Sequence, residues 1–181
     1  MSDVVITFGV RTDICDFGGA LSGISPCDLA ISVAVEAISR AGVEDGMIDQ
    51  SVFGNVIHTE PCDMYLSRVA AMGAGMSVAS TALTLNRLCG SGLQAVVTGA
   101  EQIMLGNAEI VLAGGAESMS CVGHMINAAR FGVKMGDVTH ADRLSISASL
   151  PASLRGNMRY ANTSMATSEL GTFNPLSHST Q

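Results

Sequence analysis

Cys89 lies where a reactive thiol is well placed, between an expected strand at residues 81–85 and an expected helix beginning near Leu93. The first turn of a helix offers unpaired N–H groups and a partial positive charge, which stabilise a thiolate over a thiol. Gly90 and Gly92 leave room for a large acyl group and permit backbone angles that other residues resist. The backbone N–H of Cys89 can help to hold an oxyanion. A lone cysteine is more often a buried structural residue, but this context favours a nucleophile.

The same residues also satisfy a second pattern. Residues 90–95 (GSGLQA) match G-x-G-x-x-A between a strand and a helix, the fingerprint of a dinucleotide site. That fingerprint requires an acidic residue at the end of the next strand, about 20 residues further on. The next strand instead ends in residues 113–116 (AGGA), and Glu117 arrives late. The ribose contact is therefore missing, and we favour the nucleophile.

Short apolar runs alternate with amphipathic segments, which predicts an α/β sheet covered by helices. Strands are expected at residues 4–10, 51–57, 81–85 and 109–113, and helices at 26–41, 65–72 and 93–105. Gly42 is placed to end the first helix, and Asp63 is placed to cap the second. In the third helix we expect polar residues such as Gln94 and Glu101 to face outward, and the apolar face comprises Leu93, Val96, Val97, Ala100, Ile103 and Met104.

Composition excludes several classes of protein. Hydrophobic residues make up 48% of the 181 residues and charged ones 14%, so the chain is not disordered in general. A formal charge of -7 argues against nucleic-acid binding. No apolar run is long enough for a membrane span, and the N-terminus does not resemble a signal peptide. The five cysteines include no C-x-x-C pair, so we expect no metal site and a cytoplasmic protein with free thiols.

Four segments together point to one family. Residues 86–95 (NRLCGSGLQA) resemble the active-site cysteine signature of the thiolases. The other three segments agree with that family in order and spacing, and they are residues 11–21, 54–71 and 113–120. The second of these is most similar to bacterial broad-specificity β-ketothiolases linked to polyhydroxyalkanoate synthesis. The resemblance continues through residues 130–137 and covers roughly residues 4–142.

The resemblance implies the N-terminal half of the thiolase fold, a mixed sheet covered by helices, and the activity of an acetyl-CoA C-acyltransferase. Cys89 would take an acyl group from acyl-CoA as a thioester, with Gly90 and Gly92 supporting the oxyanion and the turn. A second acetyl-CoA would then be condensed onto it, or a 3-ketoacyl-CoA cleaved in reverse. CoA thioesters are the implied substrates, without metal or other cofactor, and the complete protein would be a homo-oligomer. Met158 stands near the family's His-Met-Gly segment, which implies substrate binding.

The family's other catalytic groups are a histidine, an asparagine and a second cysteine in later motifs that do not occur in these 181 residues. We therefore expect this chain to be inactive alone. The expected division is an N-terminal α/β domain at residues 1–120, the start of the loop domain at 121–143, and a divergent tail at 144–181. That tail has no convincing core element, and it is disordered or read in a shifted frame, or the gene is truncated. The alternative function is a non-catalytic thiolase-fold fragment that associates with a full-length partner.

Overall fold

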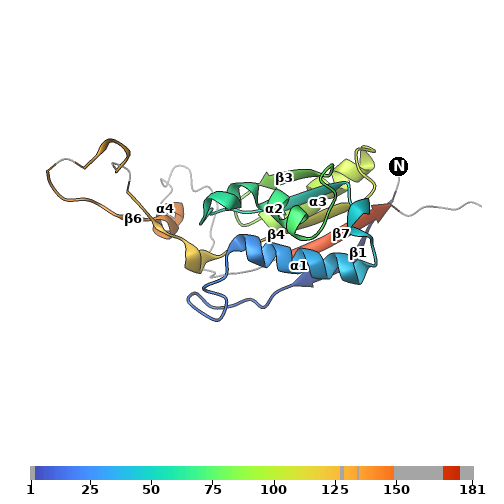
Figure 1. The fold of residues 1–181 in the computed structure, drawn as a ribbon, viewed down its shortest axis with the longest axis horizontal. Helices are drawn as coiled ribbons and strands as arrows, with labels where there is room; N and C mark the ends of the chain where they lie inside the picture. Colours follow the sequence, from blue (N-terminus) through green and yellow to red (C-terminus); the bar gives the residue numbers. More distant parts are fainter. Residues whose placement is uncertain (1–2, 127–128, 134, 149–168, 176–181) are drawn as a thin grey trace, which may run out of the picture.

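A five-stranded mixed sheet forms the centre of the computed structural model, which describes residues 3–126, 129–133, 135–148 and 169–175 (Figure 1). Its strand order is β1-β7-β4-β2-β3. The strands are β1 (Val4–Arg11), β2 (Gln50–Gly54), β3 (Thr81–Leu85), β4 (Val111–Gly115) and β7 (Glu169–Pro175). β2 pairs in parallel with β3 and β4, whereas β7 is antiparallel to both β1 and β4. The expected mixed sheet is confirmed.

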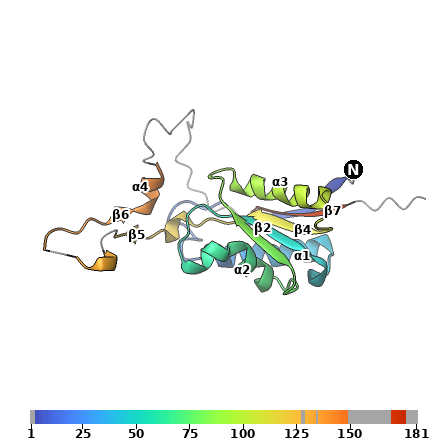
Figure 2. The same ribbon diagram turned by 90° about the horizontal axis from the view of Figure 1, so that it is seen from above.

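Helices cover both faces of this sheet (Figure 2). α1 (Pro26–Ala41) and α2 (Leu66–Gly73) lie on one face, and α3 (Ser91–Met104) lies on the other. Outside these three layers are a small sheet of β5 (His124–Met125) and β6 (Ala141–Asp142), and helix α4 (Arg143–Ala148). Short 3-10 helices are η1 (Asp45–Met47), η2 (Pro61–Tyr65), η3 (Met119–Cys121) and η4 (Ala129–Phe131). Within the described ranges no helix is long and apolar enough to cross a membrane.

Alternate side chains of the central strands enter two separate cores. Phe53 and Leu112 pack with α1 and α2, while Val52, Val111 and Ala113 pack against α3. All five side chains have no exposed surface. Successive side chains of a strand point to opposite faces of the sheet. Both faces are covered by helices, which explains why β4 is a continuous apolar run in the sequence.

The first helix has the bounds that its sequence predicts. The Ser25 side chain accepts a hydrogen bond from the backbone N–H of Asp28 at 3.1 Å, and Pro26 occupies the first turn. Gly42 ends the helix with φ 65°, and its N–H donates to the carbonyl of Ser39 at 3.2 Å. A left-handed residue at this position favours glycine. The prediction for residues 26–41 is therefore confirmed.

The buried face of α3 differs from the prediction. Leu93, Val97 and Met104 are exposed, so their assignment to the core is wrong. Ile103 of the predicted face is buried, and Val96 and Ala100 pack against the core in part. The other buried residues of the helix recur every four positions and are small: Ser91, Ala95 and Gly99. At Gly99 an added Cβ would lie 3.0 Å from Cγ1 of Val111. The small residues let α3 approach the sheet closely, and the larger apolar side chains are turned outward.

The role of Asp63 and the C-terminal strand β7 also differ from their predictions. Asp63 does not cap α2, because it lies within η2 and its carboxylate accepts hydrogen bonds from the backbone N–H groups of Thr59 and Glu60. β7 lies in the segment that we expected to hold no core element, and its backbone pairs on both sides. Residues 169–175 (ELGTFNP) include a glycine and a proline and show no apolar alternation, so the local sequence gives no strand signal. The division of the chain at residues 120 and 143 stays a prediction.

Candidate active site

Cys89 lies in the short turn that joins β3 to α3, one residue before the helix N-cap Gly90. Its side chain is exposed. The expected order of strand, cysteine and helix is present, and exposure argues against a buried structural cysteine. The thiol is therefore open to a substrate from the solvent.

Hydrogen bonds within the turn hold the backbone on both sides of Cys89. The Ser91 hydroxyl donates to the carbonyl of Leu88 at 2.6 Å and accepts from the N–H of Arg87 at 2.8 Å. The N–H of Leu88 donates to Oδ1 of Asn86 at 2.9 Å. Leu88 has φ 51°, a left-handed conformation that costs a leucine about 1–2 kcal/mol. Such conformations persist where surrounding bonds enforce them, and they cluster at functional sites.

Three polar side chains tie together the loops that follow β2, β3 and β4. Asn55 donates from Nδ2 to the carbonyl of Ala116 at 2.9 Å, and Asn86 donates from Nδ2 to the carbonyl of Val56 at 3.2 Å. The Glu117 carboxylate accepts from the backbone N–H groups that follow Asn55, at 2.9 and 3.0 Å. These three strands are parallel, so their carboxyl ends meet at one edge, where open α/β sheets bind ligands. Cys89 belongs to this edge.

Burial affects two polar groups of this edge, Glu117 and Asn55. Burial raises the pKa of the Glu117 carboxyl, and the nearby Asp63 charge acts in the same direction, against hydrogen bonds from the backbone N–H groups of Val56 and Ile57. Asn55 is 1% exposed, and its Oδ1 has no hydrogen-bond partner among the described residues. Sequence reasoning missed both as positioning residues: the predicted strand at 51–57 includes Asn55, which instead directly follows β2, and Glu117 comes two residues after β4.

The glycines around Cys89 have different surroundings. A Cβ at Gly90 would lie 3.3 Å from Nη1 of Arg87, whereas a Cβ at Gly92 would meet no atom within 4 Å. Gly92 therefore borders open space at the start of α3, whereas the space at Gly90 is partly filled by the Arg87 side chain. Gly54, whose packing role the sequence did not predict, lies directly against Ser91. Met158 lies outside the described residues.

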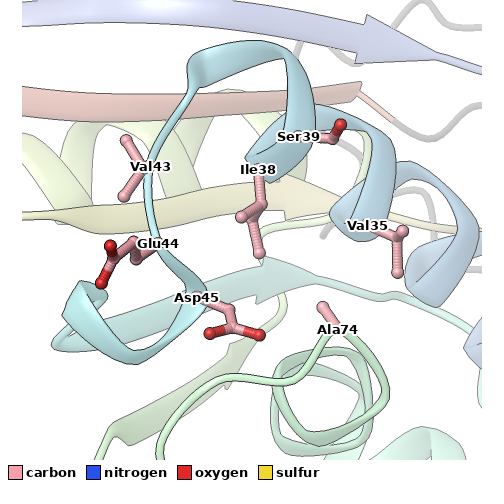
Figure 3. Close-up of a pocket in the computed structure, with 7 residues that line it drawn as sticks. All are labelled: Val35, Ile38, Ser39, Val43, Glu44, Asp45 and Ala74. Carbon is pink, nitrogen blue, oxygen red and sulfur yellow. The ribbon is translucent and has the colours of Figure 1, made fainter.

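Two other features lie away from this edge. A pocket between the end of α1, η1 and the end of α2 is lined by Val43, Glu44, Asp45 and Ala74, among others (Figure 3). These segments lead into the amino ends of β2 and β3, opposite the edge that carries Cys89. Cys27, Cys62 and Asp63 form a group of potential metal ligands in the described part of the chain.

Fold and site together define a three-layer α/β protein that presents a thiol at the carboxyl edge of parallel strands. Residues 4–169 match the model of the thiolase N-terminal domain, and the chain belongs to the thiolase family.

Named relatives agree with this assignment. The chain is 49% identical over 142 residues to the β-ketothiolase BktB of Cupriavidus necator, covering 78% of this chain and 36% of that protein. It is 40% identical to an acetyl-CoA acetyltransferase of the same organism, over 81% of this chain and 37% of that protein. The crystal structure of human mitochondrial 3-ketoacyl-CoA thiolase is similar, with a TM-score of 0.78 and 36% identity, over 81% of this chain and 37% of that chain. The chain thus spans about a third of the length of these relatives.

Proposed function

We propose that Cys89 accepts an acyl group from an acyl-CoA as a covalent thioester. The single observation that carries this proposal is the exposed thiol in a hydrogen-bonded turn between β3 and α3. The thiolate would attack the thioester carbonyl and form a carbon–sulfur bond, and the carbonyl electrons would move to an oxyanion. When the oxyanion collapses, the bond to CoA breaks and the CoA thiolate leaves and takes up a proton. Gly90 and Gly92 would support the turn and the oxyanion.

The names of the relatives support CoA thioesters as substrates, because they include an acetyl-CoA acetyltransferase and a 3-ketoacyl-CoA thiolase. A human relative has also been solved in complex with CoA. No further cofactor enters the proposed step. The condensation of a second acetyl-CoA needs a general base and an acid, and the family's motifs for them do not occur in this sequence. We therefore propose that the chain alone forms the acyl-enzyme and does not turn over.

Intact-mass measurement of the chain after mixing with acetyl-CoA tests the proposal. We expect a mass gain of one acetyl group in the wild type and in Cys15→Ala, and none in Cys89→Ala. Cys15 is a suitable control because it is another partly accessible thiol that the proposal does not use. Equal labelling of Cys89→Ala and the wild type would show that the acyl group goes elsewhere.

The outward face of α3 favours a second function, association without catalysis. Leu93, Val97 and Met104 are 66%, 42% and 55% exposed on this helix. Their spacing places all three on one face of the helix, and large exposed apolar patches mark interfaces. The chain would then act as a module that binds another thiolase-fold chain, as a homo-oligomer or beside a longer partner.

Sedimentation velocity separates the two functions. If association is the function, the wild type sediments as an oligomer and remains unlabelled by acetyl-CoA, and Leu93→Gln with Met104→Gln yields monomers. Labelling of Cys89 in a monomeric chain would support catalysis alone. The substrate contact of Met158 also remains a proposal, and Met158→Ala would then need more acetyl-CoA for the same labelling.

A further inference from the structure

A cluster of thiols and carboxylates lies between α1 and the segment that leads into α2. Cys27 stands in the first turn of α1, and Cys62 and Asp63 belong to η2. One ligand atom from each, two sulfurs and one carboxylate oxygen, all lie within 4.8 Å of one another. Cys27 and Cys62 are separated by 35 positions in the sequence, so no spacing motif indicates this cluster.

The sulfur–oxygen separations in this cluster are close to the edges of a tetrahedral metal site. Oδ1 of Asp63 lies 3.4 Å from Sγ of Cys27 and 3.9 Å from Sγ of Cys62. Sγ of Cys62 lies 3.6 Å from Oε2 of Glu60. A tetrahedral zinc ion with bonds of about 2.3 Å to sulfur and about 2.0–2.2 Å to oxygen places its sulfur and oxygen ligands about 3.5 Å apart. Small side-chain movements are therefore enough to enclose an ion.

The two oxygens of Asp63 have separate environments. Oδ2 accepts hydrogen bonds from the N–H of Thr59 at 2.6 Å, from the Thr59 hydroxyl at 2.8 Å and from the N–H of Glu60 at 3.0 Å. Oδ1 faces the two sulfurs. Asp63 is fully buried. A carboxylate whose second oxygen is fixed by neighbouring donors is the usual arrangement for a metal ligand.

We propose that Cys27, Cys62 and Asp63 bind a thiophilic divalent cation such as Zn²⁺, and that the exposed side chain of Glu60 turns toward the ion to complete the four ligands. Two thiolates and carboxylate oxygens are a ligand set that zinc accepts. Cys27 and Asp63 are buried, whereas Cys62 is partly exposed and Glu60 is exposed, so the ion has a path from solvent. The bound ion would join α1 to the loop before α2.

Binding must displace protons. Burial raises the pKa of the Cys27 thiol, and hydrogen bonding with Cys62 and Asp63 raises it further. Each thiol that binds forms a metal–sulfur bond and releases its proton to solvent. The apparent affinity should therefore rise with pH, by about tenfold per pH unit for each proton released.

Titration of the whole chain with Cd²⁺, in the presence of a phosphine reductant, tests the proposal through the ultraviolet absorption of cadmium–thiolate bonds. We expect saturation at one ion per chain in the wild type and in Cys89→Ala, and no band in the double variant Cys27→Ala, Cys62→Ala. If the double variant does not fold, the single variant Cys62→Ala takes its place in the titration, because this substitution changes only a partly exposed position. Zn²⁺ should raise the melting temperature of the wild type, and a chelator should reverse the shift.

Three results would overturn the metal site. One is the same absorption in the double variant, and another is its loss in Cys89→Ala. The third is that the reduced wild type binds no Cd²⁺. If peroxide then joins Cys27 to Cys62 as a disulfide, the pair is redox-active and is not a metal site.

Discussion

Gly54 of β2 lies against Ser91 of α3 so closely that a Cβ at position 54 would be 2.6 Å from the Cβ of Ser91 and 2.7 Å from its carbonyl carbon. Ser91 is also the residue whose hydroxyl bonds to both Arg87 and Leu88. The position of the turn that carries Cys89 therefore depends on the absence of a side chain in a neighbouring strand.

Gly54→Ala should displace the start of α3, because backbone atoms of Ser91 cannot move as a flexible side chain would. We expect a loss of about 1–3 kcal/mol in the free energy of unfolding and weaker acetylation of Cys89. Urea denaturation and intact-mass labelling measure the two effects. Gly23→Ala is the matched control, because a Cβ there meets nothing within 4 Å and its φ is not positive. Equal stability of the two variants would show that α3 moves freely.

Gly92→Ala should separate folding from substrate approach. A Cβ at Gly92 meets no atom within 4 Å, and alanine favours a helix over glycine by about 1 kcal/mol, so stability should be unchanged or slightly higher. Acetylation should slow, because the added methyl group occupies space that the acyl-CoA would enter. Thermal melting and the rate of adduct formation distinguish the effects. Unchanged labelling would remove Gly92 from the proposed site.

Leu88→Asn should relieve the strained backbone before Cys89. Leu88 is 44% exposed, so little packing is lost, and asparagine tolerates the left-handed region better than leucine. We expect a gain of up to about 1 kcal/mol in the free energy of unfolding. The control is Leu105→Asn, at an exposed leucine with φ -80° that should show no gain. The same change in stability at Leu88 as at Leu105 would show that the turn holds no releasable strain.

The sequence predicts the elements best where local chemistry determines them. α1 has a capping serine, a proline in its first turn and a glycine after its end, and its predicted bounds are confirmed. The strand–cysteine–helix order around Cys89 follows from equally local signals. The nucleophilic role of Cys89 stays a prediction.

Features that depend on contacts between distant segments were not predictable. Hydrophobicity alone placed Leu93 in the core, whereas the close contact of Gly99 with Val111 turns α3 the other way. β7 depends on hydrogen bonds from two neighbouring strands, which its own residues do not indicate. The proximity of Cys27 to Asp63 likewise arises only when α1 packs beside η2.

Asp63→Asn should make stability less dependent on pH. Burial by itself would raise the pKa of Asp63, but hydrogen bonds from Glu60, Thr59 and Cys27 outweigh it and hold the pKa below its ordinary value of 3.8. A lowered pKa in the folded state stabilises the fold above the ordinary value, and that contribution is lost as the pH falls through the folded value. With a chelator present, the variant should lose about 1–3 kcal/mol at neutral pH, since one oxygen acceptor and the charge are removed. The loss should shrink in acid, where the wild-type carboxyl is itself neutral.

Urea denaturation at neutral and acidic pH measures this difference, with the exposed Asp13→Asn as control. A loss that stays constant or grows in acid would show that Asp63 does not stabilise the fold through its charge.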